Sequence, residues 1–391
     1  MLHFFLILLF IRPFISSPAF PYADSIYWLL LFLFLLCRII LKGLPLNESK
    51  AVKYPLVLFI SALLVSTFFS DNKTAGLWLW LNGKPNHCLA GLKELQKYTA
   101  YLLIFLISAS LTNKEKTKII RTFILSGFII GLLTIYQYFF GFQHLLDYAI
   151  RQGITNQFAL DYIVRKRVFF PFVTPNALAG YLIMIIPLTL ISRQTILLLI
   201  PLILGLFLTQ SLGALLSLFL GTIIYFYLRG KFKKRRLFII LGLLALAGFI
   251  FITRMGTQKE HFQLSFSTAM RLSYWRETIQ LIKSHPFIGA GPGNFDLADS
   301  RYAHNSYLQL WAETGILGIG AFIWLLFSIF RAVSKNTNYR GEKNTNICLY
   351  TASIIFLMHN FIDFTFFLPE IALIWWLISG LTISAVKPCL P

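Results

Sequence analysis

Long apolar segments separated by short polar stretches dominate this sequence and constrain its fold. Hydrophobic residues make up 57% of the 391 residues and charged residues 13%, whereas a soluble globular domain carries about 25% charged residues. In hydrocarbon, each backbone polar group needs a hydrogen-bond partner within the protein, and a helix supplies that partner inside its own segment. The sequence therefore predicts an all-α, polytopic membrane protein.

The apolar segments are interpreted as about twelve transmembrane helices, because most are long enough to cross a hydrocarbon core of about 30 Å. We expect them near residues 2–18, 26–42, 53–70, 97–112, 119–142, 174–191, 194–210, 212–228, 237–254, 305–330, 346–365 and 369–386. No linker of low complexity divides the chain. We treat residues 1–391 as a single membrane domain, with an outer loop at 255–304 that contains an amphipathic helix.

The net charge of +20 is interpreted as an orientation signal. The run RGKFKKRR at residues 229–236 predicts a cytoplasmic loop, since short basic loops stay on that side of the membrane. This anchor places both termini in the cytoplasm, and most of the positive charge then lies there too. Orientation in the membrane explains this distribution better than nucleic-acid binding, which requires a basic face or stripe. The expected partners therefore include membrane lipids and no nucleic acid.

The interval 255–304 predicts a helix that ends before Pro286. Ser267 or Thr268 can serve as its N-cap. One apolar stripe follows at helical spacing, formed by Leu272, Trp275, Ile279 and Ile282. The helix is too short and too charged to span, so it is expected on the membrane surface or against helix ends. Arg271 and Arg276 lie on it, and the segment GAGPGN at 289–294 predicts a turn rather than a nucleotide loop.

A polar cluster lies at 304–313, where the next apolar segment begins. Asn305 or Ser306 can cap that helix, which places His304 at its start beside water. Helical spacing predicts that Tyr307, Leu308 and Trp311 share the face of His304, and that Ser306, Gln309 and Glu313 form a second, polar face. His304 is a candidate for chemistry, or alternatively an interfacial anchor. Glu313 is either functional or a partner in a structural hydrogen bond or ion pair inside the bundle.

A second basic cluster, Arg165 to Arg167, precedes the segment that begins at Thr174. Thr174 and Pro175 suit the N-cap and first helical position, with Asn176 in the first turn. A helix start beside guanidinium groups suits a phosphate or a diphosphate. Interaction with lipid headgroups is the alternative.

A further polar pair is formed by His359 and Asp363, which are four residues apart and can share a hydrogen bond in one helix. This pair suits a buried structural role at least as well as a catalytic one. No HExxH, CxxC or aspartate-rich cluster occurs outside the predicted spans, so no metal site is predicted.

Taken together, these residues resemble the O-antigen ligase/polymerase family of bacterial membrane glycosyltransferases. The resemblance is carried by Arg167 with PNALA at 175–179, by Arg271 with Trp275 and HPFIGAG at 285–291, by HNSYLQLWAETGILG at 304–318, and by His359 with Asp363. These elements run in family order across residues 165–376. Residues 209–214 read TQSLGA where the family usually has Ser-Arg-Gly, so Leu212 replaces a positive charge at the outer boundary of a span.

The resemblance implies transfer of a glycan from an undecaprenyl-diphosphate carrier to an acceptor hydroxyl at the outer face of the inner membrane, without metal or other cofactor. It implies that His304 activates or orients the acceptor and that Arg271 and Arg167 stabilise the diphosphate. The other implied roles are substrate binding, for Arg165, Asn176, Arg276, Asn305 and Tyr307, and support of the site, for Glu313, His359 and Asp363.

Two points stay open. The acceptor, which decides between a ligase and a polymerase, is a lipid A core, a growing glycan or a protein side chain. The alternative hypothesis from a different functional class is a small-anion transporter. A transporter would be expected to have internal repeats and broken or charged helices at the membrane midplane. Neither feature is clear in this sequence.

Overall fold

The computed structural model describes residues 1–43, 50–69, 87–153, 160, 163–230, 242–243, 245–252, 264–297, 300–334 and 343–384. These residues form helices, turns and loops without a strand, which confirms the all-α class for the described part of the chain. Two compact units share the chain, each built from three segments. The first contains Met1–Phe34, Asn113–Ile252 and Ile347–His359, and the second contains Leu35–Thr112, Thr253–Asn346 and Asn360–Pro391.

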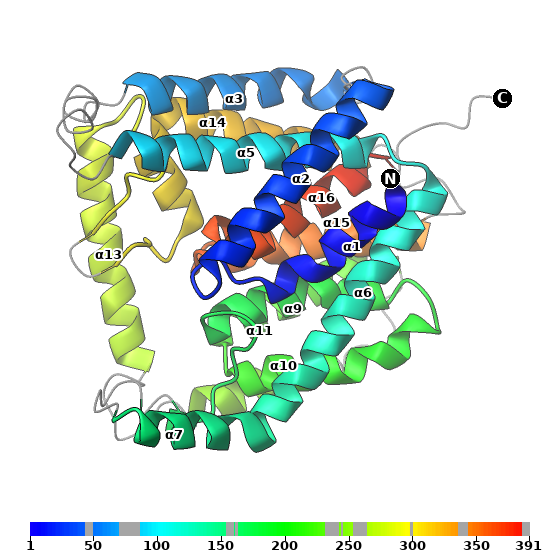
Figure 1. Cartoon of the computed structure of the whole chain (residues 1–391), viewed down its shortest axis with the longest axis vertical. Coiled ribbons are helices and arrows are strands. Elements are labelled where there is room, and N and C mark those ends of the chain that lie inside the picture. Colours follow the sequence, from blue (N-terminus) through cyan, green and yellow to red (C-terminus); the bar gives the residue numbers. More distant parts are fainter. Residues whose placement is uncertain are drawn as a thin grey trace. The chain divides into compact units, whose positions relative to one another are not determined.

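Each predicted span contains helical residues (Figure 1). The α-helices are α1 (Leu2–Ile11), α2 (Pro21–Lys42), α3 (Lys50–Phe69), α5 (His87–Ala109), α6 (Asn113–Tyr136), α7 (Phe142–Arg151), α9 (Pro175–Thr189), α10 (Leu199–Thr209), α11 (Leu212–Leu228), α13 (Leu264–Ser284), α14 (Ser306–Ser334), α15 (Lys343–His359) and α16 (Pro369–Ser384). In the predicted ninth span, the described residues 242–243 and 245–252 are helical.

Within the described residues, four helical stretches are long and apolar enough to cross a membrane: Pro21–Lys42, Val52–Phe69, Asn113–Arg151 and Ser306–Arg331. Other apolar helices, among them Pro175–Thr189 and Leu212–Leu228, are shorter. The chain is therefore a membrane protein, whereas the count of about twelve spans and the outer position of 255–304 stay predictions. Most of the basic run used to orient the chain lies outside the described residues.

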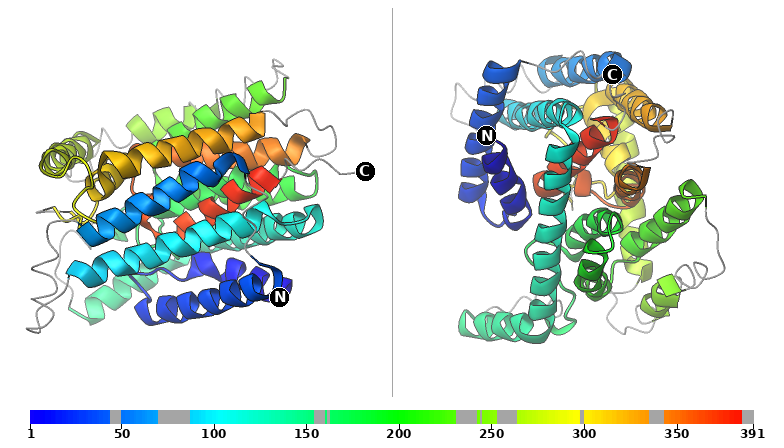
Figure 2. Two further views of the ribbon diagram at one scale, coloured as in Figure 1. Left: turned by 90° about the horizontal axis from the view of Figure 1, so that it is seen from above. Right: turned by 90° about the vertical axis from the view of Figure 1, so that its right-hand side faces the viewer.

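In the first unit, α6 packs against α9 and α10. Glycines permit this approach: a Cβ on Gly131 would lie 2.8 Å from the carbonyl carbon of Pro201, and one on Gly205 would lie 2.6 Å from Thr134 Oγ1. Small residues at helix contacts are the usual means of close packing in membranes. Figure 2 shows the chain turning where α6 passes through the π-helix Gln137–Gly141 into α7.

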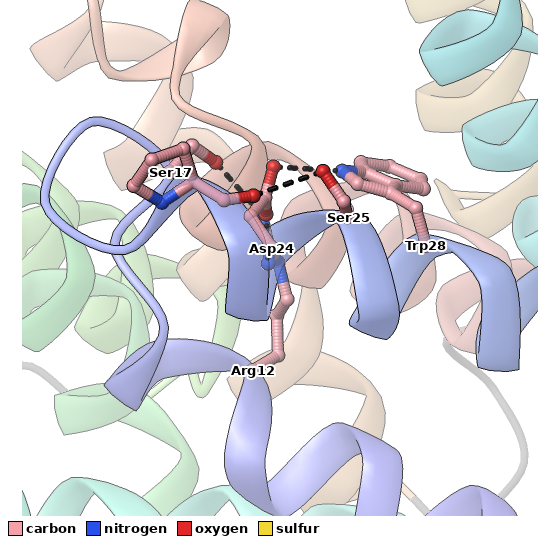
Figure 3. Close-up of polar contacts among 6 residues, drawn as sticks. Arg12, Ser17, Asp24, Ser25 and Trp28 are labelled. Atoms are coloured by element: carbon pink, nitrogen blue, oxygen red, sulfur yellow. Dashed lines mark hydrogen bonds and ion pairs between the residues drawn. The ribbon is translucent and has the colours of Figure 1, made fainter.

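An ion pair joins the first two helices of the same unit. Arg12, which is 0% exposed, donates through Nη1 to Asp24 Oδ1 at 2.7 Å. Its guanidinium carbon lies 4.6 Å from the ring centre of Tyr27, and Trp28 Nε1 donates to the other carboxylate oxygen of Asp24 at 3.2 Å. Figure 3 shows Arg12 reaching Asp24 from below, with Trp28 to the right of it. Pairing offsets part of the cost that a buried cation incurs on leaving water.

In the second unit, α3 lies along α14 and α5 lies along α16. Aromatic rings join these helices, because the ring of Trp376 on α16 lies 6.4 Å from Phe59 on α3, 6.1 Å from Phe105 on α5 and 6.3 Å from Phe322 on α14. A side chain on Gly380 would overlap the carbonyl oxygen of Phe105. This aromatic core packs α3, α5, α14 and α16 together.

The predicted helix of the interval 255–304 is present as α13, which packs against α14. The expected N-cap was wrong, because α13 begins at Leu264 and Ser267 and Thr268 already lie inside it. The predicted stripe is also divided: Leu272 and Ile279 are 46% and 42% exposed, whereas Ile282 is buried. The predicted stripe therefore spans a wider arc of the helix than the part of α13 that is buried against α14.

Candidate functional site

His304 lies in the second unit, in the loop that leads into α14. Its φ angle is +50°, a left-handed conformation that costs a residue with a Cβ about 1–2 kcal/mol. Its ring stacks on Tyr274 of α13, with centroids 5.6 Å apart and planes 19° apart. The edge of the ring meets Phe364 at 4.8 Å. The imidazole is thus held between aromatic rings from α13 and from the turn that precedes α16.

His304 does not begin α14, so the predicted helical spacing from His304 to Tyr307, Leu308 and Trp311 was wrong. The helix begins at Ser306. Asn305 is its cap, as predicted, because Asn305 Oδ1 accepts the N–H groups of Tyr307 at 3.0 Å and Leu308 at 3.1 Å.

The turn that follows α15 is hydrogen-bonded to the start of α14. The N–H of Ser306 donates to the carbonyl oxygen of Asn360 at 2.9 Å, and Ser306 Oγ donates to Asn360 Oδ1 at 2.7 Å. Asn360 Oδ1 also accepts the N–H of Phe366 at 2.8 Å. The segment that follows His304 is therefore tied to a buried turn that sequence reasoning did not find.

The electrostatic surroundings of His304 favour the neutral imidazole. Burial lowers its pKa below the ordinary value, and the positive charge of Arg271 lowers it further, whereas the carboxylate of Asp363 acts in the opposite direction. Arg271 lies on the half-buried face of α13, one turn before Tyr274, and its Nη1 donates to Ser267 Oγ at 2.8 Å. A neutral imidazole next to a fixed guanidinium can accept a proton beside a group that binds anions.

The second, polar face predicted for α14 is present and buried. Gln309 Nε2 donates to Glu313 Oε1 at 3.1 Å, and Gln309 Oε1 accepts the N–H of Ala303 at 3.2 Å. Ser306, Gln309 and Glu313 are each less than 5% exposed. Glu313 therefore takes part in a buried hydrogen bond, one of the two roles considered for it.

A break in α14 lies two residues after Glu313. Gly315 has φ +64° and ψ −171°, a combination open essentially to glycine alone. The segment 286–291 lies against the break and pairs with its backbone: Gly291 N–H donates to Glu313 O at 2.9 Å, Ala290 N–H to Ala312 O at 2.9 Å, and Ile316 N–H to Pro286 O at 2.9 Å. The predicted turn GAGPGN is thus also a support for α14, a role that sequence reasoning missed.

The basic trio lies in the first unit. Arg165 Nε donates to Gln210 Oε1 at 3.4 Å and Arg167 Nε to the carbonyl oxygen of Thr209 at 3.0 Å. Burial lowers the pKa of Arg165, and the charge of Arg167 lowers it further, so the two cations repel each other. An anion bound there would relieve that repulsion. Gln210 belongs to the stretch that departs from the family pattern, and its φ of +54° turns the chain between α10 and α11.

The structure brings some of the predicted site residues together and separates others. Arg271 lies near enough to His304 for its charge to act on the imidazole, whereas Arg276 lies on the exposed face of α13. Tyr307 contacts the ring of Phe361 at 4.3 Å. In the first unit, Asn176 lies in the first turn of α9, where Thr174 Oγ1 accepts the N–H of Ala177 at 3.1 Å, so the predicted N-cap is confirmed.

His359 and Asp363 do not lie one helical turn apart, because α15 ends at His359. Asp363 lies in the following turn, where Oδ1 accepts the N–H of Phe364 at 2.9 Å. The expectation of a pair within one helix was therefore wrong. Within the described residues, no group of three or more His, Cys, Asp or Glu side chains is arranged to hold a metal ion.

Tyr274, Phe364 and Asn360 are the residues of this site that sequence reasoning missed. Tyr274 carried a usable signal, since it follows Arg271 by three residues and shares its face. Phe364 and Asn360 carried none, because their contacts with 304–306 join segments more than fifty residues apart in the chain.

Comparison with known proteins supports the resemblance. Residues 197–323 match the family model described as O-antigen ligase. The matched residues include Arg271, His304 and Glu313, and they exclude Arg167 and Asp363. A protein from Rickettsia conorii (strain ATCC VR-613 / Malish 7), provisionally named a polysaccharide ligase, is 24% identical over an alignment that covers 51% of this chain and 52% of the relative. The alignment thus spans about half the length of the curated relative.

Proposed function

We propose that the protein is a membrane glycosyltransferase of the ligase type, because its residues 197–323 match the family model described as O-antigen ligase. The proposed donor is a glycan on undecaprenyl diphosphate, and the proposed acceptor is a hydroxyl group of a lipid A core or of another glycan. The reaction takes place at the outer face of the inner membrane, with both termini in the cytoplasm. The provisional name of the Rickettsia relative favours a ligase over a polymerase.

The observation that carries this proposal is the place of His304 beside Arg271. In the proposed reaction, His304 accepts the proton of the acceptor hydroxyl as the acceptor oxygen attacks the anomeric carbon. The bond from that carbon to the diphosphate oxygen breaks, and the negative charge moves onto the diphosphate. General-base catalysis of this kind contributes about 10²- to 10⁴-fold in rate. The neutral imidazole favoured by burial is the form that can accept a proton.

Arg271 is proposed to stabilise the diphosphate leaving group. A guanidinium group binds phosphate oxygens through a planar fork of N–H donors, and a preorganised positive charge is most effective where negative charge develops. In the first unit, Arg165 and Arg167 are proposed to bind phosphate oxygens, a proposal supported by the mutual repulsion of their charges. This chemistry needs no metal ion from the protein.

Transfer by the purified protein in nanodiscs tests the proposal, with lipid-linked glycan and lipid A core supplied. His304→Gln removes the proton acceptor and is expected to lower the turnover rate about 10²-fold or more. His144→Gln on α7 is the matched control, because His144 is exposed in the first unit. Wild-type transfer by a correctly inserted His304→Gln protein would overturn the assignment of His304.

The surface glycans of a deletion strain distinguish the two acceptor classes. Loss of all attached polymer, with accumulation of the lipid-linked glycan, indicates a ligase. Attachment of single repeat units indicates a polymerase. Movement of a small anion into proteoliposomes without any glycan transfer would contradict both.

A further inference from the structure

Gln309 joins the loop that carries His304 to the interior of α14. Its side chain is 3% exposed and both ends of its amide are used. Oε1 accepts the N–H of Ala303, the residue before His304, at 3.2 Å. Nε2 donates to Glu313 Oε1 at 3.1 Å.

The chemistry of the two partners determines the orientation of this amide. The N–H of Ala303 can only donate, so it must face the amide oxygen of Gln309. The amide nitrogen then faces Glu313, whose carboxylate accepts. Glutamine is the long side chain that carries one acceptor and one donor at the same end, so no apolar side chain of similar size can make both bonds.

The partner of Gln309 in α14 is itself fixed. The carbonyl oxygen of Glu313 accepts Ser66 Oγ from α3 at 2.7 Å and the N–H of Gly291 at 2.9 Å. Gly289 lies so close that a Cβ there would overlap the Glu313 carbonyl group. Gln309 therefore connects the loop of His304 to Glu313, whose backbone is held by Ser66 of α3 and by Gly291.

His304 needs such a connection, because its left-handed backbone is unfavourable for a residue with a side chain. A residue persists in this conformation only when its surroundings impose it. Ala303 on one side is completely buried and bonded to Gln309. Asn305 on the other side is committed to capping α14.

From these contacts we propose that Gln309 is a positioning residue for His304. By holding the N–H of Ala303, it sets the backbone conformation of His304 and so directs the imidazole toward the substrate. The inference rests on the proposed function, in which His304 acts on the acceptor hydroxyl. Gln309 itself does not touch the substrate.

Substitutions of Gln309 distinguish an effect of its hydrogen bonds from an effect of its side-chain volume. Gln309→Met keeps the length of the side chain and removes both hydrogen bonds; it is expected to lower kcat about 10- to 100-fold, the usual effect of displacing a catalytic group by about 1 Å. KM for the lipid-linked donor is expected to stay within about twofold, because donor binding is not altered. Gln280→Met, on the exposed face of α13, is the matched control and is expected to behave as wild type.

Gln309→Glu gives a distinct pH signature. One carboxylate oxygen can still accept the N–H of Ala303, but the other faces Glu313, and two adjacent carboxylates share one proton only at lower pH. The activity of Gln309→Glu relative to wild type is therefore expected to fall as pH rises. A substitution that merely loosened the packing would lower activity at every pH alike.

A measurement that needs no glycan transfer completes the test. Diethyl pyrocarbonate modifies neutral imidazoles, and mass spectrometry gives the modification rate of His304 in the intact protein in nanodiscs. In Gln309→Met this rate is expected to differ from wild type by severalfold, whereas that of His144 is unchanged. An unchanged rate at His304, or equal changes at both histidines, would overturn the inference. If His304→Gln kept full transfer while Gln309→Met altered only His304, the proposed function would fail and the positioning role would stand.

Discussion

Gly315 and Phe287 approach each other so closely that a Cβ on Gly315 would overlap the carbonyl group of Phe287. The contact is reinforced by a backbone hydrogen bond from Leu317 N–H to the Phe287 oxygen at 3.4 Å. The break in α14 and the segment 286–291 therefore form one support, which holds Glu313 and, through Gln309, the loop of His304.

Gly315→Ala is expected to destabilise the protein by at least about 1–3 kcal/mol, the usual cost of a residue with a side chain in this backbone region, with the overlap at Phe287 adding to it. The midpoint of thermal unfolding in detergent measures the effect. Gly320→Ala is the control, because a Cβ at Gly320 meets nothing within 4 Å and alanine favours a helix. Equal midpoints for the two variants would contradict this account of the break.

The ion pair of Arg12 and Asp24 predicts a large effect from removal of one partner. Asp24→Asn removes the negative charge beside the buried guanidinium and is expected to cost about 3–5 kcal/mol. The double variant Arg12→Met with Asp24→Asn is expected to recover part of that loss, since no unpaired charge remains.

Glu94→Gln provides the comparison for that pair. It breaks the contact between Glu94 and Lys97, whose side chains are 23% and 26% exposed, and pairs of this kind contribute about 0–1 kcal/mol. Chemical unfolding of the purified variants measures both effects. A double variant less stable than Asp24→Asn would show that Arg12 acts mainly through its contacts with aromatic rings.

The pH dependence of transfer follows from the lowered pKa of His304. Activity that needs the neutral imidazole is present above that pKa and is lost as the pH falls through it, below the ordinary histidine value of about 6.5. Arg271→Gln removes a charge that lowers the pKa, so its acidic limb is expected at higher pH. Asp363→Asn removes a charge that raises the pKa, so its limb is expected at lower pH.

Profiles of kcat/KM against pH measure these shifts. Lys283→Gln, an exposed change in the last turn of α13, is expected to leave the limb in place. Shifts of the same sign for Arg271→Gln and Asp363→Asn would exclude His304 as the group that titrates.

Asn305→Ala is expected to destabilise the start of α14 by about 1 kcal/mol, because two N–H groups lose their acceptor. Asn305→Asp keeps an acceptor oxygen at the N-cap and is expected to retain most of the stability. Hydrogen exchange of the amides of Tyr307 and Leu308 reports the loss locally. Unchanged exchange in Asn305→Ala would mean that the bonds from Ser306 to Asn360 hold the helix start without the cap.

Local patterns predicted much of this fold. The apolar runs indicated a helix in each expected span, and the pairs Thr174–Pro175 and Asn305–Ser306 indicated two helix starts. The polar spacing of Ser306, Gln309 and Glu313 indicated a second, polar face of α14. Each of these features depends on residues within a few positions of one another, where the backbone and its nearest side chains determine the conformation.

Other features of the site depend on contacts between distant segments. Nothing near Ser267 showed that α13 begins at Leu264, and Gly315 alone did not show that α14 breaks there. The stacking of His304 on Tyr274 joins residues thirty positions apart, and the bonds of Ser306 to Asn360 join residues 54 apart.

By itself, then, the sequence determined that the chain is helical, that it belongs in a membrane and that His304 precedes a capped helix, because hydrophobicity and capping act locally. Only the tertiary structure decided that His304 adopts a left-handed backbone, and that the segment 286–291 and Gln309 support it. The reason is physical: that conformation is unfavourable for an isolated residue and is maintained by hydrogen bonds and close backbone contacts that exist only after α3, α13 and α14 have packed together.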